Sequence, residues 1–150
     1  MKVIAIIPAR MGSSRFPGKP MYPLLRIPMI GHCYYRSKMS HCLDDVYIAT
    51  CDEEIHEYSR SIGATCVMTA DSHERASDRT AEAMIKAEKI LNIKIDIVVM
   101  VQGDEPMVTP QMISDSIKPF MFNENINVVN LMAEMTSVKE FEDPNEVKVV

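Results

Sequence analysis

Short apolar runs alternate with helix-patterned stretches along most of this chain, and no other sequence feature restricts its fold as strongly. The first run, at residues 3–7, is continuous and is closed by Pro8, which is typical of a strand buried on both faces. The strongest strand pattern lies at residues 95–101, which are apolar except for Asp96. Strands that alternate with helices predict an α/β fold, a three-layer sandwich with a mainly parallel sheet. The four runs expected to form its strands are residues 3–7, 46–50, 65–68 and 95–101.

The stretches between these runs carry helix-capping signals. Asp52 is placed to cap a helix that Gly63 would end, and Ser77 or a neighbour is placed to cap the next one. Thr109, followed by a proline, has the form of a third cap, and that helix should end or kink near Pro119, which lacks an amide hydrogen. Helices are expected at residues 29–39, 52–63, 77–91 and 110–119, with further strands at residues 127–135 and 146–150.

Composition and charge exclude several classes of protein. With 47 % hydrophobic and 25 % charged residues, the chain matches the globular average and is neither disordered nor a coiled coil. Its net charge of −5 argues against a nucleic acid or an anionic membrane as partner, so any bound anion must be held by a local cluster of cations. The apolar run at residues 3–7 is shorter than the ~7–15 residues of a secretory signal, so we expect a cytoplasmic location.

The loop after the first strand combines cations with small residues. Glycines let backbone amides approach phosphate oxygens, hydroxyls add donors, and arginine binds an anion through two parallel hydrogen bonds. This chemistry suits a polyphosphate, although a solvated turn with cations that only aid solubility explains the same residues. The loop is not a Walker A motif, because Pro20 stands where a serine or threonine would hold magnesium. Its characteristic residues are Arg10, Gly12, Ser13, Ser14, Arg15, Gly18 and Lys19.

A second loop with unusual chemistry follows the strand at residues 95–101. Asp104 lies directly after this strand, beside Gly103 and Glu105. Magnesium takes one or two protein carboxylates and completes its coordination with water and phosphate oxygens. Asp104 facing a triphosphate fits that pattern, with Glu105 as the competing ligand, although the same residues also suit an ordinary β-turn.

Several motifs together resemble the sugar-acid cytidylyltransferases, and among them the enzymes for 3-deoxy-manno-octulosonate (KDO). The resemblance runs in register along all 150 residues. The matching motifs are Ile-Pro-Ala-Arg at residues 7–10, Ser-Ser-Arg at 13–15, Pro-Gly-Lys-Pro at 17–20, Pro-Met-Ile at 28–30, Val-Gln-Gly-Asp-Glu-Pro at 101–106 and Asp-Pro-Asn-Glu-Val-Lys-Val-Val at 143–150.

The resemblance implies a fold of the nucleotide-diphospho-sugar transferase type, which is Rossmann-like. It also implies a CTP-dependent nucleotidyltransferase of lipopolysaccharide biosynthesis, in which the anomeric hydroxyl of a 2-keto sugar acid attacks CTP and releases pyrophosphate. Asp104 would hold Mg²⁺. The catalytic residues would be Arg10, Arg15, Lys19 and Asp104, and the CTP contacts Ala9, Arg10, Ser13, Ser14, Arg15, Lys19, Ser77, Arg79 and Gln102.

The resemblance leaves part of the assignment open. Arg75 and Ala76 stand where these enzymes have serine and glycine, whereas His73, Asp78 and Arg79 match in type. Substrates of the neuraminate or nonulosonate type, a spore-coat-type enzyme, or a catalytically silent nucleotide-binding regulator are the alternatives. These residues also have an explanation without a ligand, in which Ser77 caps a helix and Arg79 is solvated.

The resemblance also bears on how the chain is organised. We expect residues 1–150 to be the nucleotide-binding part of a single cytidylyltransferase domain that is truncated at its C-terminus. In its full-length form the protein is expected to be a homodimer, with neither a nucleic-acid nor a membrane partner.

Overall fold

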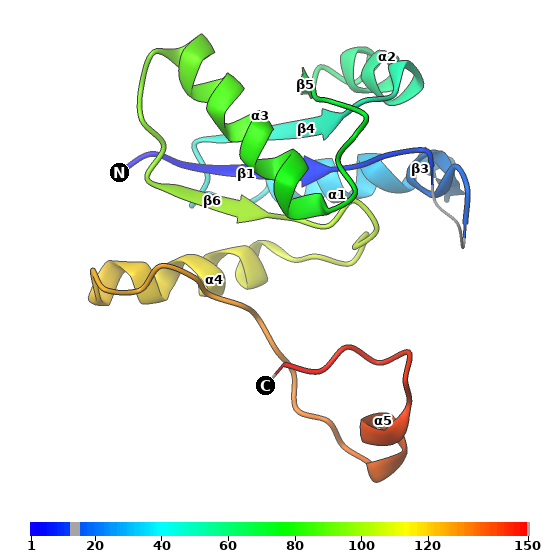
Figure 1. Ribbon diagram of the computed structural model, residues 1–150, viewed down its shortest axis with the longest axis vertical. Coiled ribbons are helices and arrows are strands. Elements are labelled where there is room, and N and C mark those ends of the chain that lie inside the picture. Colours follow the sequence, from blue (N-terminus) through cyan, green and yellow to red (C-terminus); the bar gives the residue numbers. More distant parts are fainter. Residues whose placement is uncertain (13–15, 150) are drawn as a thin grey trace.

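A four-stranded parallel sheet forms the centre of the structure, a computed structural model that describes residues 1–12 and 16–149 (Figure 1). Its strands lie in the order β5-β4-β1-β6, so the chain extends the sheet in one direction from β1 and then returns to add β6 on the other side. This reversal beside β1 is a topological switch point, where the carboxyl ends of neighbouring strands leave a crevice for ligands. The strands are β1 (Val3–Pro8), β4 (Asp45–Thr50), β5 (Thr65–Met68) and β6 (Ile97–Met100).

Helices cover both faces of the sheet, which confirms the predicted three-layer sandwich. On one face, Ile30, Ile55 and Ile113 of three helices pack with Ile7 and Ile48 of the sheet. The opposite face packs against α3 (Ala76–Leu91) alone among the described helices. The three helices of the first face are α1 (Met29–Lys38), α2 (Glu53–Ser61) and α4 (Pro110–Phe122).

Helix α3 begins one residue before the expected Ser77, α4 ends three residues past Pro119, and one predicted cap is confirmed. Helix α3 begins at Ala76 with Arg75 at the cap position and no side-chain cap, so Ser77 already lies inside its first turn. Helix α4 continues past Pro119 to Phe122, because a proline removes only one amide donor, and the Asn123 N–H closes the last turn on the Pro119 carbonyl at 3.2 Å. The Thr109 cap is confirmed, since its side chain accepts from the amide of Met112 at 3.2 Å.

The loop after β1 contains a short hairpin that the sequence pattern did not predict. A 3₁₀ turn, Lys19–Met21, is followed by β2 (Pro23–Leu24) and β3 (Ile27–Pro28), which pair antiparallel. Leu25 and Arg26 form the connecting turn, with φ angles of 49° and 72°. Both residues therefore occupy the left-handed region, where a Cβ atom costs about 1–2 kcal/mol.

We expect the double substitution Leu25→Asn and Arg26→Gly to stabilise the protein by about 0.5–1 kcal/mol. Asn-Gly is the preferred pair for a two-residue turn with two positive φ angles, and Leu25 is 94 % exposed, so little burial is lost. Thermal unfolding should show a rise in Tm of about 1–4 °C. Arg26→Ala, which keeps the Cβ atom, is the control, and an equal gain from it would contradict the explanation.

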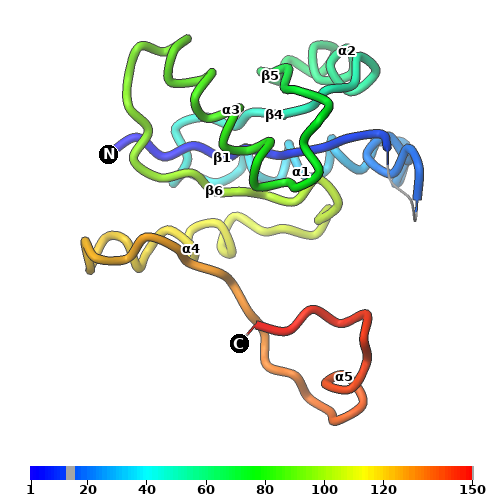
Figure 2. Tube along the Cα trace, viewed as in Figure 1, coloured from blue at the N-terminus to red at the C-terminus, as the bar shows by residue number. Residues whose placement is uncertain are grey.

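After α4 the chain runs away from the sheet as an extended segment that carries α5 (Val138–Glu142) (Figures 1 and 2). Strands were predicted at residues 127–135 and 146–150, but over the described residues, which end at 149, neither segment pairs with another strand. An extended segment becomes a strand only when its amides and carbonyls find a partner chain. None of the described helices combines the length and apolar character that a membrane-spanning helix needs.

Candidate functional site

A cleft of about 350 Å³ lies at the carboxyl ends of β1 and β6, at the switch point of the sheet. It brings the first loop together with the loop after β6 and with the segment that leads into α3. Its lining residues are Pro8, Ala9, Arg10, Lys19, Pro20, His73, Glu74, Arg75, Ala76, Arg79, Gln102, Gly103 and Asp104.

Two glycines allow these loops to approach each other. A Cβ atom on Gly103 would lie 2.8 Å from the carbonyl oxygen of Pro8, so only glycine lets the loop after β6 pass so close to the end of β1. Gly18 has a φ of 73° and caps the 3₁₀ turn that begins at Lys19. The two glycines therefore place Asp104 and Lys19 on facing sides of the cleft.

Lys19 and Asp104 form an ion pair across the cleft. Lys19 Nζ lies 2.6 Å from Asp104 Oδ2, and the two side chains are 35 % and 46 % exposed. An exposed pair of this kind contributes only about 0.2–1 kcal/mol, so a ligand that binds either side chain can separate the pair at little cost.

The first loop is fixed to the sheet by hydrogen bonds from its backbone. The Ala9 amide donates to the Ala49 carbonyl at 2.9 Å, and the Met11 amide donates to Asp52 Oδ2 at 2.8 Å. Asp52 occupies the cap position of α2, as predicted, but its carboxylate binds the loop instead of the helix. Arg10, which lies between these anchors, donates from Nη1 to the carbonyl oxygen of His73 at 3.4 Å.

Arg79 supplies a buried cation to the wall of the cleft. Its side chain is on α3, the residue is 2 % exposed, and Nη1 donates to Thr69 Oγ1. Nη2 is also buried and has no hydrogen-bond partner within residues 1–12 and 16–149. A buried guanidinium nitrogen without an acceptor is costly, so this nitrogen is a candidate donor to a ligand oxygen. The alternative of a solvated arginine is wrong.

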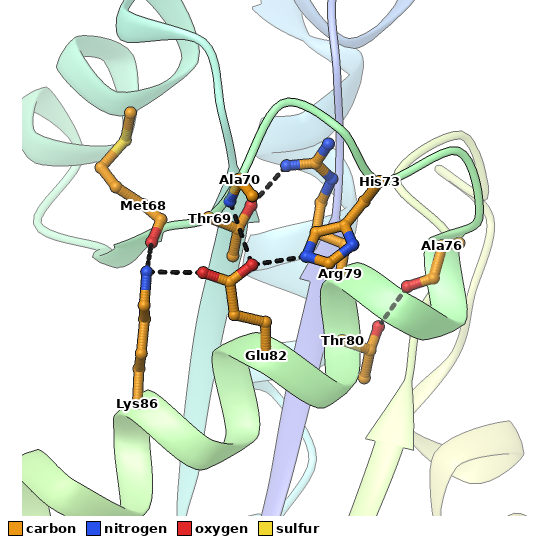
Figure 3. Close-up of polar contacts among 9 residues, drawn as sticks. All are labelled: Met68, Thr69, Ala70, His73, Ala76, Arg79, Thr80, Glu82 and Lys86. Carbon is orange, nitrogen blue, oxygen red and sulfur yellow. Dashed lines mark hydrogen bonds and ion pairs between the residues drawn. The ribbon is translucent and has the colours of Figure 1, made fainter.

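Glu82 holds the segment between β5 and α3 in place (Figure 3). Its Oε2 accepts from the Ala70 amide at 3.0 Å and is hydrogen-bonded to His73 Nε2, while Oε1 pairs with Lys86 Nζ at 2.6 Å. Lys86 also donates to the Met68 carbonyl at 2.7 Å. The hydrogen bond from Lys86, followed by those from Ala70 and His73, lowers the pKa of Glu82 from 4.5 to about 2.

A sequence profile of the cytidylyltransferases matches residues 4–150. The chain belongs to the cytidylyltransferase family. It is 40 % identical over 150 residues to the 3-deoxy-manno-octulosonate cytidylyltransferase of Geobacter metallireducens, covering 100 % of this chain and 57 % of the relative. The mitochondrial enzyme of the same name from Arabidopsis thaliana is 40 % identical over 151 residues, which cover 99 % of this chain and 50 % of that protein.

A solved structure of CMP:2-keto-3-deoxy-manno-octonic acid synthetase complexed with CTP is similar in fold and sequence. It superposes with a TM-score of 0.77 and 33 % identity, over 84 % of this chain and 50 % of that one. The chain thus spans little more than half the length of the relatives it matches. The central sheet with helices on both sides is the fold of this nucleotidyltransferase type, as predicted.

The cleft brings together most of the cytidylyltransferase site residues that the sequence singled out. Ser77 is exposed on the first turn of α3 and does not line the cleft, whereas its neighbour Arg75, the departure from the family pattern, does. Ser13, Ser14 and Arg15 lie outside the described residues. The predicted residues that do line the cleft are Ala9, Arg10, Lys19, Arg79, Gln102 and Asp104.

Two carboxylates, Asp104 and Glu74, line the cleft, and of these the sequence motif singled out Asp104 as the metal ligand. Across the part of the chain that the structure describes, no group of three or more His, Cys, Asp or Glu side chains is placed to hold a metal ion. Asp104 is exposed at the cleft and offers a hard oxygen ligand, as Mg²⁺ prefers, and Mg²⁺ usually takes its remaining ligands from water and phosphate. The residues present fit such an ion when a triphosphate is bound.

The network around Glu82 predicts a specific dependence of stability on pH. Because the folded pKa is lowered, the contribution of Glu82 is complete above about 4.5 and is lost as the pH falls toward 2. Glu82→Gln should therefore lower Tm by a few degrees at pH 7, and the difference from wild type should shrink between pH 4.5 and pH 2. Thermal unfolding followed by circular dichroism measures it. A difference that stays constant over this range would contradict the assignment.

Proposed function

We propose that the protein transfers a cytidylyl group from CTP to the anomeric hydroxyl of a 2-keto-3-deoxy sugar acid of the KDO type, producing CMP-sugar and pyrophosphate. The observation that carries the proposal is the cleft at the switch point, where Arg10 and Lys19 meet Asp104. The names of the matched relatives support KDO as the acceptor, and the CTP complex of the similar structure supports CTP as the donor.

In the proposed reaction, the anomeric oxygen forms a bond to the α-phosphorus of CTP. The bond between the α-phosphorus and the oxygen that bridges to the β-phosphorus breaks. Pyrophosphate leaves with the electron pair, and the hydroxyl proton is released. The protein contributes by positioning the reactants and by stabilising charge, as in phosphoryl transfer generally. Arg10 and Lys19 carry the positive charge that offsets the charge of the leaving pyrophosphate.

The remaining residues of the cleft have supporting roles in this proposal. Ala9 and Gln102 line it where a nucleotide or sugar acid would lie, and Arg79 Nη2 would donate to a ligand oxygen. Asp104 would hold Mg²⁺, and a bound Mg²⁺ supplies neutralisation of phosphate charge. Ser13, Ser14 and Arg15 are proposed to add donors to the phosphates, and Ser77 is retained as a proposed CTP contact only through the resemblance.

The same resemblance supports a homodimer of the full-length protein, a cytoplasmic location and a role in lipopolysaccharide biosynthesis. These parts of the proposal rest on the resemblance alone. Size-exclusion chromatography with light scattering tests the dimer.

Two measurements test the proposed function. Calorimetric titration with CTP, with and without Mg²⁺, measures donor binding, and pyrophosphate release against KDO, neuraminate-type acids and other sugar acids measures catalysis. Both use the longest natural polypeptide that carries these 150 residues. Release with KDO supports the proposal. Release only with another acid overturns the acceptor, and CTP binding without release for any acid favours a silent regulator.

Arg79→Met is expected to separate ligand binding from stability. Methionine fills similar apolar volume without a charge, and replacing a buried, incompletely paired charge by an apolar side chain is often neutral or stabilising. CTP affinity should fall about tenfold, since a hydrogen bond from a charged donor contributes about 1.5 kcal/mol or more. Calorimetry and thermal unfolding together test this. A variant that binds CTP like wild type would show that Arg79 Nη2 has no acceptor on the nucleotide.

A further inference from the structure

The wall of the cleft formed by residues 73–76 depends on a side chain that lies behind it. Glu82 is on the second turn of α3, and it does not itself line the cleft among the described residues. Figure 3 shows its carboxylate reaching from the helix toward Ala70 and His73. A single oxygen, Oε2, binds both the amide of Ala70 and the ring of His73. It therefore fixes two points of the segment that leads from β5 into the cleft.

The segment fixed in this way contacts Arg10 in the loop after β1. The carbonyl oxygen of His73 accepts from Arg10 Nη1, 63 positions earlier in the chain, at 3.4 Å. His73 is hydrogen-bonded through its ring to Glu82 and through its carbonyl to Arg10, so Glu82 restrains the residue that supplies the acceptor of Arg10. Arg10 is an exposed, long side chain, and a fixed acceptor restricts the rotamers it can adopt.

The other carboxylate oxygen of Glu82, Oε1, further restrains this side chain. Oε1 pairs with Lys86 one turn further along α3, and Lys86 Nζ reaches the Met68 carbonyl at the end of β5. Glu82 is thus tied to the strand before the segment as well as to the segment itself. The side chains of Glu82 and His73 are 25 % and 23 % exposed, so solvent competes only in part for these bonds.

We propose that Glu82 is a positioning residue for nucleotide binding, which acts by fixing His73 so that its carbonyl orients Arg10 in the cleft. This inference rests on the proposed function, since it takes CTP as the ligand that Arg10 meets. It assigns Glu82 no contact with the nucleotide and no part in the chemical step. Removing the Glu82 carboxylate should therefore weaken CTP binding only by changing the orientation of Arg10.

A double-mutant cycle on the full chain tests this route. Glu82→Ala should weaken CTP binding about tenfold in calorimetry, whereas the same substitution in an Arg10→Ala background should have almost no further effect. Glu82→Gln keeps an oxygen that can accept from the Ala70 amide, so its affinity should lie between wild type and Glu82→Ala. In steady-state assays Glu82→Ala should change KM for CTP and kcat in the same directions as Arg10→Ala does, and by no more, because it acts only through Arg10.

Glu88→Ala is the matched control for any loss of stability. Glu88 is on the same helix and also binds one backbone amide, that of Ile95 at 3.0 Å, and one lysine, Lys94 at 3.0 Å, but it does not line the cleft. It should lower Tm without weakening CTP binding.

The possible outcomes separate this inference from the proposed function. A wild-type chain that does not bind CTP overturns the proposed function. A wild-type chain that binds CTP, together with a folded Glu82→Ala variant that binds it equally well, overturns the inference alone. Equal losses in the wild-type and Arg10→Ala backgrounds also overturn it, because they show that Glu82 does not act through Arg10.

Discussion

Replacing Asp104 by asparagine is expected to lower the turnover of CTP and sugar acid by a factor of about 10²–10⁴ while the fold persists. Asparagine keeps the shape of the side chain and an oxygen for Lys19, but it removes the charge that a divalent cation needs. Asp104 is exposed in the loop after β6, so its substitution disturbs no buried contact. Pyrophosphate release at fixed Mg²⁺ concentration measures the effect.

The same variant should bind CTP in the absence of Mg²⁺ at least as well as wild type. In wild type, Asp104 pairs with the ammonium group of Lys19 and would repel phosphates that bind beside it. Glu105→Gln is the control, because it neutralises the neighbouring carboxylate, which does not line the cleft within the described residues. Near wild-type turnover by Asp104→Asn, or an equal loss in both variants, would contradict the role of Asp104.

The strands of the central sheet could be predicted from the sequence because a buried strand consists of consecutive apolar residues. A strand covered by helices on both faces must be apolar at every position, and β1 is buried along its whole length. Residues 127–135 show why this signal is insufficient alone. They are rich in apolar residues and extended in the structure, but a strand also needs a partner, and pairing depends on the rest of the molecule.

Part of the site was predictable for a related reason. Lys19 and Asp104 are 85 positions apart, yet each follows a strand expected in one parallel sheet, and the carboxyl ends of such strands meet at one edge. The ion pair between them was not predicted, because each was assigned separately to a phosphate or a metal.

Glu82 could not be identified from the sequence. Its partners Ala70 and His73 lie on an irregular segment whose path no periodicity predicts, and a glutamate on a helix is ordinarily a solvated residue. The nine-residue spacing from His73 to Glu82 corresponds to no local helical contact, since His73 precedes the helix. Only the way the segment folds back over α3 makes the two residues neighbours.

The substitution Lys19→Ala is expected to weaken CTP binding about ten- to a hundredfold and CMP binding much less. We assign Lys19 to the outer phosphates, and a charge-assisted hydrogen bond contributes about 1.5–3 kcal/mol. Removing Lys19 also leaves Asp104 as an unpaired negative charge in the cleft. The loss should therefore be larger without Mg²⁺, when nothing neutralises that carboxylate, than with it. Calorimetric titrations with CTP and CMP, each with and without Mg²⁺, measure all four affinities.

Lys118→Ala gives a matched control for the loss of one positive charge. Lys118 pairs with Asp115 at 2.6 Å, the same distance as Lys19 and Asp104, but on α4 and without lining the described cleft. If Lys19 acted only through the net charge of the chain, the two variants would weaken CTP binding equally. Equal losses for CTP and CMP in Lys19→Ala would instead place the lysine at the α-phosphate or the nucleoside. The assignment to the outer phosphates requires two results. Lys19→Ala must weaken CTP binding more than CMP binding, and it must weaken CTP binding more than Lys118→Ala does. Only a local contact with the terminal phosphates produces both differences.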